Sequence, residues 1–221
     1  MTQRHGDWIQ TYSGRQFHPL DPSADEIDIV DIAHALSNVC RFNGHCARHY
    51  SVAEHSIHVA LHVAWDDEPT ERTTVLAALL HDASEAYLCD IPKPLKTTQA
   101  MAPYRAMESK VEFIIAAKFG LPDPMPDIIK RHDLRALATE YRDLVPNKIH
   151  DWHLPEPAWL DMPPWSLRTT ETAFECMGID AQAVHVRSLF LAMYRHISGD
   201  TSVIVDNIAA EQADWLLRCM G

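Results

Sequence analysis

The sequence predicts an all-α protein that carries one small β-hairpin near its N-terminus. Apolar residues recur at helical spacing through most of the chain, beginning with Ile29, Ile32 and Leu36. Proline and glycine end these stretches at short intervals. The chain contains no internal repeat, low-complexity tract or linker, so we expect a single domain over residues 1–221, with a motif-bearing core at about residues 25–146.

The predicted hairpin comes first in the chain. Two short segments, Trp8–Tyr12 and Arg15–His18, flank Ser13 and Gly14. A serine–glycine pair between two such segments fits a two-residue hairpin turn. Pro19 follows and ends the unit, because proline has no backbone N–H to donate to a strand ladder.

Two helices are predicted next. Apolar spacing predicts a helix over Asp25–Val39, and a loop rich in charged and aromatic residues follows over Arg41–Tyr50. Ser51 is suited to cap the next helix, and Glu54 three residues later completes a capping box. That helix is expected to end near Trp65, before an acidic run that closes in proline.

The rest of the chain is also predicted to be mostly helical. One helix should run from Thr70 or Thr73 to about Leu88, because two prolines follow shortly afterwards. Residues 152–164, rich in proline and tryptophan, should form an ordered loop. The other stretches of helical spacing cover residues 104–119, 127–144, 166–177, 181–196 and 207–219.

The composition predicts a cytoplasmic globular protein. Apolar residues make up 47% of the chain and charged residues 23%, as in soluble domains. No apolar run approaches the ~18–20 residues of a membrane span, and the first residues contain no apolar signal region. The five cysteines form no C-x-x-C motif and are odd in number, so we expect reduced thiols, mostly in the core.

The formal net charge of −12 restricts the partners of the protein. Long nucleic acids are disfavoured, because a surface that follows their phosphates is basic. A nucleotide remains possible, since it needs only a few local cations and a metal ion.

The most informative feature is His81–Asp82, which directly follows the apolar run Val75–Leu80. Burial of these side chains and the nearby Glu85 costs free energy unless something compensates, and a metal ion is the usual compensation. The dipeptide alone means little, because 14 histidines and 19 aspartates produce about one such step by chance. Three occur, the others being His132–Asp133 and His150–Asp151.

Two further residues complete a candidate metal site. His55 lies in the middle of one predicted helix and Asp133 in another. His81 and Asp82 can both reach an ion in a groove beside their helix, and Glu85 lies one turn later on the same face. Two imidazoles and two carboxylates suit Zn, Mn, Fe, Co or Ni rather than Ca.

Histidines also have simpler interpretations. A single histidine on an apolar helix face is more often a hydrogen-bonded core residue than a ligand. His58 and His62, one helical turn apart, have ligand spacing but lack the glutamate of a zincin pattern. His45 and His49 in the preceding loop could face solvent or substrate as well as a metal.

The set His55, His81–Asp82 and Asp133 resembles the H…HD…D pattern of the HD-domain phosphohydrolase superfamily. The resemblance implies that the all-α fold is an HD-domain helical bundle that binds a divalent metal. It covers about Ala33 to Asp143 and does not extend to the hairpin or to the region after about Pro146.

One branch of the superfamily is especially similar. The runs Ser51–Ser56 and His81–Glu85, followed by Asp90–Pro92 and Lys96, look like those of bacterial HD-type 5′-deoxynucleotidases. Phage and prophage HD proteins, including phage-encoded dATP triphosphohydrolases, are similar as well. Arg41–Phe42 stands where the deoxynucleotidases have an Arg–Trp pair near the sugar and phosphate, so Phe42 departs from their pattern.

The resemblance implies a role for each matching residue. Glu85 would position or activate water or hold the leaving group, and Asp90 would orient the water or protonate the leaving oxygen. Arg41, Phe42 and Lys96 would bind the substrate, with the two cations at its phosphate. The implied metal ligands are His55, His81, Asp82 and Asp133.

The ligand set also limits the metal. Four protein ligands would close a tetrahedral ion but leave two positions open on an octahedral one, and phosphate-ester hydrolysis requires open positions. We therefore expect one divalent ion, from among Mn, Co, Ni, Fe, Mg and Zn, and favour octahedral coordination.

Four functions are compatible with the sequence. The first is a 5′-deoxynucleotidase that releases phosphate from dNMPs. The second is a dNTP triphosphohydrolase, which should need more cations around the phosphate tail. The third is a catalytically silent nucleotide-binding regulatory module, and the fourth is a structural helical protein with a coincidental His–Asp pair. The candidate extra cations are Arg4, Arg15, Arg48, Lys93, Arg131 and Arg135.

The resemblance also predicts a homodimer or a higher homo-oligomer. Several tryptophans in the second half of the chain suit an interface, although core packing would explain them equally well. They are Trp152, Trp159, Trp165 and Trp215.

Overall fold

Three helices, α2 (Val52–Ala64), α3 (Arg72–Leu80) and α9 (Ile179–Ser198), pack against one another at the centre of the structure. The computed structural model describes residues 4, 6–66, 70–159 and 179–218. Helix α1 (Ile29–Asn38) packs on α2 and α9, and α7 (Asp127–Leu144) packs on α2 and α3. The all-α fold with an N-terminal hairpin is therefore confirmed.

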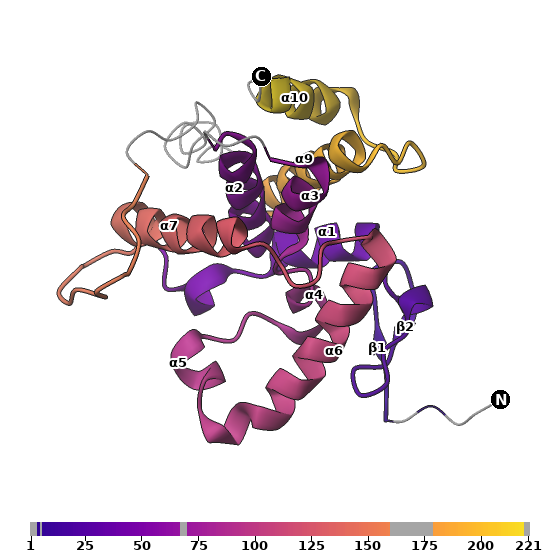
Figure 1. Ribbon diagram of the computed structural model, residues 1–221, viewed down its shortest axis with the longest axis horizontal. Helices are drawn as coiled ribbons and strands as arrows, with labels where there is room; N and C mark the ends of the chain where they lie inside the picture. The colour runs from indigo at the N-terminus through magenta and orange to yellow at the C-terminus, as the bar shows by residue number, and fades with distance from the viewer. Residues whose placement is uncertain (1–3, 5, 67–69, 160–178, 219–221) are drawn as a thin grey trace.

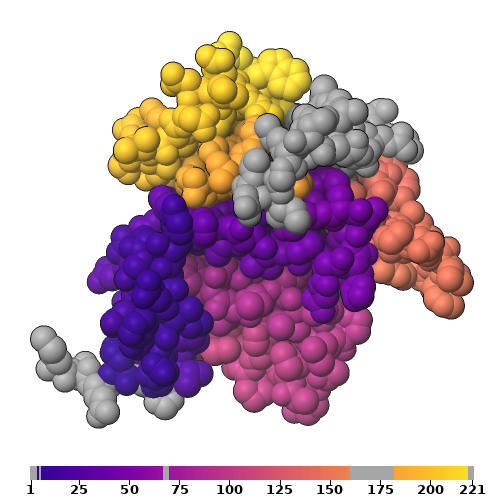
Figure 2. Space-filling view, turned by 180° about the vertical axis from the view of Figure 1, so that it is seen from behind, coloured from indigo at the N-terminus to yellow at the C-terminus, as the bar shows by residue number. Residues whose placement is uncertain are grey.

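The outer elements surround this centre (Figure 1). Helix α10 (Asn207–Arg218) covers α9 at one end, and α6 (Ala102–Phe119) reaches away from the other helices toward the opposite end. Between α4 and α6 lie the short α5 (Lys93–Lys96) and η3 (Gln99–Met101). Figure 2 shows the same order from behind, with α10 in yellow above and the magenta α5–α6 region below. None of the helices in the described ranges is both long and apolar enough to cross a membrane.

Helix α2 is the most enclosed element. Every residue from Val52 to Leu61 is buried, including two histidines and Glu54. Helix α3 is buried from Val75 to Leu80. Helices that are buried on nearly all sides lie in the interior of a bundle rather than on its surface, so polar side chains on α2 and at the end of α3 must find partners inside.

The hairpin is present, but its loop differs from the prediction. Strand β1 (Ile9–Gln10) pairs with β2 (Gln16–Phe17), and the Thr11 N–H donates to the Arg15 carbonyl at 3.0 Å. The loop therefore spans three residues rather than two. Gly14 supplies its left-handed residue, with φ of 86°, as three-residue hairpin loops require.

Several helix bounds agree closely with the sequence. Helix α7 follows Pro126 as predicted, and Gly120 ends α6 in the left-handed conformation. Helix α1 begins later than predicted, at Ile29, because the Asp28 side chain accepts a hydrogen bond from the Val30 N–H at 2.8 Å. A separate turn, η1 (Ala24–Glu26), precedes it.

Two of the sequence predictions concern residues that the structure does not describe: the helix over 166–177 and Trp165. The three cysteines described as free are half-buried or exposed rather than part of the core, which corrects the prediction for them. They are Cys40, Cys46 and Cys89.

The prediction of one long helix ending near Leu88 is wrong, because the helix is interrupted after Leu80. Helix α3 ends at Leu80, and a second helix, α4, covers Glu85–Leu88. Between them the backbone forms tighter turns, in which the Ala83 N–H donates to the Leu80 carbonyl and the Glu85 N–H to the Asp82 carbonyl, both at 3.0 Å. These three-residue turns replace the four-residue bonds of an α-helix, so the His–Asp pair lies at a break.

We predict that Leu79→Ala lowers the free energy of unfolding by about 2–5 kcal/mol, because it leaves a cavity at a site with no solvent exposure. Urea unfolding followed by circular dichroism measures the change. Leu95→Ala is the matched control, since Leu95 is 51% exposed and its loss should cost less than about 0.5 kcal/mol. Equal effects of the two substitutions would contradict the packing described.

Candidate metal centre

His55 is the deepest residue of the centre. It lies one turn into α2, whose first turn is fixed by the Ser51 hydroxyl accepting from the Glu54 N–H at 3.2 Å. The His55 side chain has no solvent exposure. A buried imidazole needs a partner for each ring nitrogen, and His55 finds them on two sides.

Three potential ligand atoms lie close to the Nε2 atom of His55. The His81 Nε2 atom lies 3.3 Å away, Asp133 Oδ1 3.4 Å away, and Asp82 Oδ2 3.6 Å away. His81 Nε2 and Asp82 Oδ2 are 3.2 Å apart. Ligand atoms around one transition-metal ion lie about 3.0–3.5 Å apart, given metal–ligand bonds of about 2.1 Å, so this arrangement fits a metal ion.

These ligands come from separate parts of the chain. His55 is on α2, His81 and Asp82 are at the break after α3, and Asp133 is on α7. Among the described residues, a group of three metal-capable side chains with mutually close ligand atoms occurs here and consists of His55, His81 and Asp82. The structure therefore brings three of the four predicted residues into one group that could bind a metal ion, and the fourth, Asp133, lies beside His55.

Hydrogen bonds orient both imidazoles toward the same point. The Nδ1 atom of His81 lies 2.8 Å from the Ala78 carbonyl oxygen, which can only accept a hydrogen bond. The Nδ1 atom of His55 lies 2.6 Å from Glu140 Oε1. With Nδ1 donating in both rings, the Nε2 lone pairs are available to a cation.

Glu140 is the main functional candidate that the sequence analysis missed. Its side chain is 2% exposed, and its carboxylate accepts from the Tyr50 hydroxyl at 2.9 Å and from Arg41 Nε at 3.2 Å. Burial alone would raise the pKa of Glu140, but Arg41 and His55 together hold it below its usual value. The signal in the sequence is its position seven residues after Asp133, two turns along the same face of α7.

Glu54 does not support a ligand imidazole. Its carboxylate pairs with Arg48, whose Nη2 lies 2.6 Å from Glu54 Oε1. The capping box predicted for this helix is therefore only half formed, because the Glu54 side chain does not return to the Ser51 N–H. Glu140 occupies the supporting position at His55 instead.

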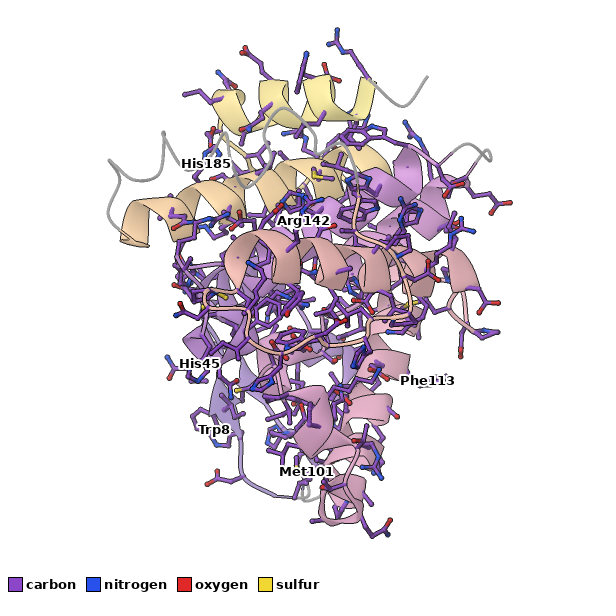
Figure 3. All side chains as sticks on the ribbon, turned by 90° about the vertical axis from the view of Figure 1, so that its left-hand side faces the viewer. Trp8, His45, Met101, Phe113, Arg142 and His185 are labelled. Carbon is purple, nitrogen blue, oxygen red and sulfur yellow. The ribbon has the colours of Figure 1, made fainter. Side chains whose placement is uncertain are left out.

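Arg41 lies between the ligands and the rim of the centre. Its Nη2 atom is 3.2 Å from Glu140 Oε2 and its Nη1 atom is 3.7 Å from Asp82 Oδ2. Arg41 begins the turn η2 (Arg41–Gly44), in which Phe42 has a φ of 55°. Figure 3 views the molecule from the side of α7, with Arg142 on that helix and His45, at the end of η2, below it.

Glu85 and Asp90 extend the centre with two more acids. Glu85 is 9% exposed, and its Oε2 atom has no hydrogen-bond partner. Burial, with Asp82 and Asp90 nearby, raises the pKa of Glu85 to about 10. Burial also raises the pKa of Asp90, although Arg41 opposes the shift. Glu85 therefore holds a proton at neutral pH in the absence of a further cation.

Lys96 reaches the same region from α5. Its Nζ atom lies 2.6 Å from Glu108 Oε1 on α6, and its positive charge lowers the pKa of Glu85. The side chain is 29% exposed, so part of the ammonium group faces solvent. The structure thus places Arg41, Glu85, Asp90 and Lys96 around the four ligands.

The other histidine candidates lie elsewhere. The ring of His62 stacks on Trp159, with centroids 3.5 Å apart, and is separate from the four ligands. His132 Nε2 lies 2.8 Å from Asp66 Oδ2, so this second His–Asp pair contributes only its aspartate to the centre. The third pair, at 150–151, is exposed.

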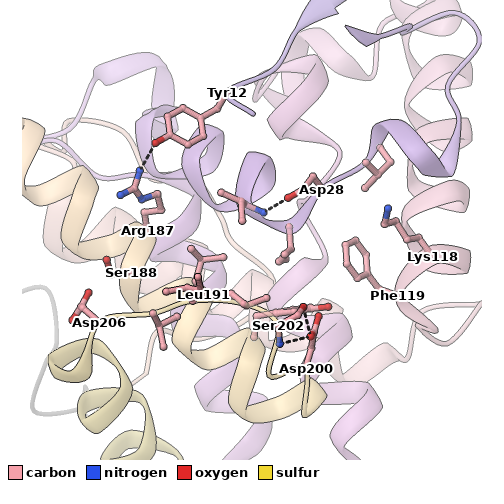
Figure 4. A pocket seen from close by; sticks show the side chains of 17 residues that line it. Tyr12, Asp28, Lys118, Phe119, Arg187, Ser188, Leu191, Asp200, Ser202 and Asp206 are labelled. Atoms are coloured by element: carbon pink, nitrogen blue, oxygen red, sulfur yellow. Dashed lines mark hydrogen bonds between the residues drawn. The ribbon is translucent and has the colours of Figure 1, made fainter. Parts of the chain in front are cut away.

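A hollow of about 990 Å³ lies in another part of the structure (Figure 4). It is lined by residues of the hairpin, α1, α6 and α9, among them Tyr12, Lys118, Phe119 and Arg187. Arg187 Nη1 donates to the Tyr12 hydroxyl at 3.3 Å. None of the candidate site residues lines this hollow, so the two features are distinct.

Comparison with known proteins identifies relatives of unknown function. The chain is 44% identical over 137 residues to the uncharacterized protein YfdR of Escherichia coli strain K12, an alignment that covers 62% of this chain and 72% of YfdR. It is 39% identical over 126 residues to the uncharacterized protein RCAP_rcc00048 of Rhodobacter capsulatus, covering 56% of this chain and 64% of that protein. No family model matches the chain.

We predict that Glu140→Gln weakens divalent-metal binding by about 10- to 100-fold, because the amide cannot support the His55 imidazole as a carboxylate does. Isothermal titration calorimetry with Mn²⁺ or Co²⁺ measures the affinity, and circular dichroism verifies folding. Glu26→Gln is the matched control. The Glu26 carboxylate pairs with His18 at 2.7 Å and with Arg4 at 3.0 Å in the same way, but away from the centre. Unchanged affinity in Glu140→Gln would contradict this role.

Proposed function

We propose that this chain, which belongs to the same family as YfdR of Escherichia coli, is a divalent-metal-dependent phosphohydrolase of the HD-domain type. Its proposed reaction is the release of phosphate from deoxynucleoside 5′-monophosphates. The observation that carries the proposal is the convergence of four N and O ligand atoms, His55 Nε2 lying 3.3–3.6 Å from the other three, beside Glu85 and Arg41.

The proposed cofactor is one divalent ion from among Mn, Co, Ni, Fe, Mg and Zn. His55, His81, Asp82 and Asp133 would hold it, which leaves two positions of an octahedral ion for water and substrate. When bound, such an ion neutralises charge on a phosphoryl oxygen and lowers the pKa of a coordinated water.

The acids Glu85 and Asp90 would move protons during the reaction. Glu85 is buried, and its pKa is raised chiefly by that burial, so it would donate a proton to the leaving 5′-oxygen. Asp90 is more exposed and would accept the proton of the attacking water.

Arg41 and Lys96 would bind the phosphate. Arg41 is held from behind by Glu140 and lies next to Asp82, so its guanidinium is fixed beside the ligands. A planar guanidinium suits two phosphate oxygens at once, and an ammonium group suits a single contact.

We favour a monophosphate over a triphosphate, because Arg41 and Lys96 are the candidate cations that lie near Asp82 and Glu85. Four of the six additional cations considered for a triphosphate tail pair with carboxylates: Arg4 with Asp21 and Glu26, Arg15 with Asp28, Arg48 with Glu54, and Arg131 with Asp66. Lys130 is likewise held by Asp133, with Nζ 2.6 Å from Oδ2.

We predict that the protein loaded with Mn²⁺, Co²⁺, Mg²⁺ or Ni²⁺ converts dNMPs to deoxynucleosides and inorganic phosphate. Chromatography separates phosphate from triphosphate. His81→Ala should lower kcat/KM at least about 100-fold, whereas His196→Ala on α9 should leave it unchanged. Triphosphate release from dNTPs would replace the proposed reaction with the alternative. Nucleotide binding without any product would indicate a silent binding module.

We predict that Glu85→Gln lowers kcat by about 10²- to 10⁴-fold with little change in metal affinity, because the amide occupies the same space but cannot donate an acidic proton. Steady-state kinetics with a dNMP gives kcat, and calorimetry gives the metal affinity. If Glu85→Gln lost the metal as well, Glu85 would be a ligand rather than an acid.

A further inference from the structure

Three aromatic side chains pack together at the rim of the metal centre. The Trp152 ring lies 4.5 Å from the Tyr141 ring and 5.9 Å from the Phe42 ring, measured between centroids. Tyr141 belongs to α7, Phe42 to η2, and Trp152 to the segment that follows α7. We call this group of Phe42, Tyr141 and Trp152 the aromatic shelf.

The shelf adjoins the polar part of the site residue by residue. Phe42 follows Arg41 in the chain, and Tyr141 follows Glu140, so two residues of the shelf are direct neighbours of the Arg41–Glu140 pair in the sequence. The Cζ atom of Arg41 lies 5.4 Å from the centroid of the Phe42 ring. The Phe42 ring of the shelf therefore lies next to the guanidinium that is proposed to bind the phosphate.

The shelf is open to solvent on one side. Trp152 is 43% exposed and Phe42 is only half-buried, whereas Trp159 in the same segment is 3% exposed. An aromatic residue that served only to fasten the segment to α7 would gain more by being covered, as Trp159 is. The exposed rings of the shelf thus offer a surface for another flat apolar group.

The backbone at Phe42 is unusual in the same place. Phe42 and the following Asn43 have φ values of 55° and 50°, in the left-handed region that ordinary side chains avoid. Two bonds maintain the turn: the Arg41 N–H donates to the Tyr50 carbonyl at 2.9 Å, and the His45 N–H donates to the Phe42 carbonyl at 2.9 Å. Such conformations cluster at functional sites, where they fix the direction of a side chain.

We propose that the aromatic shelf binds the purine or pyrimidine base of the substrate by stacking, with Trp152 as its principal contact. The inference rests on the proposed function, since it takes the phosphate to lie at Arg41. The Tyr141 hydroxyl already donates to the His150 carbonyl, so recognition would use ring faces rather than the edges of the base. Stacking of this kind tolerates every base, because each has a π-face.

The test compares substrates with and without a base. The dNMPs dAMP and dTMP carry one, and 2-deoxyribose 5-phosphate has the same phosphate and sugar without it. In the wild type, kcat/KM should be about 5- to 100-fold higher for the dNMPs, mainly through KM. Trp152→Ala should abolish this preference and leave hydrolysis of 2-deoxyribose 5-phosphate unchanged, and Trp152→Phe should restore most of it.

Trp8→Ala is the matched control for this substitution. Trp8 has the same exposure of 43%, but it immediately precedes β1, on the opposite side of the molecule from α7 in Figure 1. Equal loss on both substrates in Trp152→Ala would overturn the proposal, since Trp152 would then only support the fold. Equal rates on both substrates in the wild type would overturn it as well.

A binding measurement distinguishes failure of the base-stacking proposal from failure of the hydrolase proposal. If neither substrate is hydrolysed, the hydrolase proposal fails, and calorimetric titration with dAMP then decides about the shelf. A dissociation constant that rises about 5- to 100-fold in Trp152→Ala, but not in Trp8→Ala, would support base binding. Absence of dAMP binding by the wild type would overturn it.

Discussion

The buried carboxylate of Glu140 is the interaction on which the site depends. It accepts hydrogen bonds from residues 85, 90 and 99 positions away in the chain: His55, Tyr50 and Arg41. A buried carboxylate costs several kcal/mol unless its partners are well placed, so α2, α7 and η2 can pack only where all three donors reach it. One side chain thereby orients a ligand imidazole and anchors the arginine beside it.

The break between α3 and α4 is the second constraint on the site. In a continuous helix, His81 and Asp82 would point about 100° apart, but the tighter turns bring His81 Nε2 and Asp82 Oδ2 to 3.2 Å. Tertiary contacts hold α4 in place. Its Tyr87 stacks on Phe17 of the hairpin, with centroids 4.3 Å apart, and the Tyr87 hydroxyl accepts from the Asp28 N–H at 3.2 Å. The hairpin thus helps to fix the geometry of the site.

The helices and their ends could be predicted because short stretches of sequence determine them. Proline before α7 and glycine after α6 set helix ends by backbone chemistry, and apolar spacing located the helices that hold His55 and Asp133. The break after Leu80 could not be predicted in this way, because Ala83 to Ala86 favour a helix locally and α4 packs on α1 and on Phe17, which are distant in the chain.

The same reasoning explains the site residues that the sequence analysis missed. Glu54 and Glu140 are both glutamates on helices that carry a candidate ligand. The choice depends on Arg48, which pairs with Glu54 and leaves Glu140 to support His55. Trp152 belongs to an irregular segment, whose path over α7 no periodicity encodes.

The charge balance of the centre would couple binding of the proposed metal ion to binding of the proposed phosphate substrate. Arg41 is paired with Glu140, Lys96 with Glu108, and Lys130 with Asp133, so the described cations nearest the centre are already engaged. Asp82, Glu85 and Asp90 then leave an excess of acidic groups, which adds to the effect of burial in raising the pKa of Glu85. An anionic phosphate would be repelled by such a surface. A divalent ion at the candidate ligands would remove that repulsion, so binding of the proposed phosphate substrate would depend on the ion.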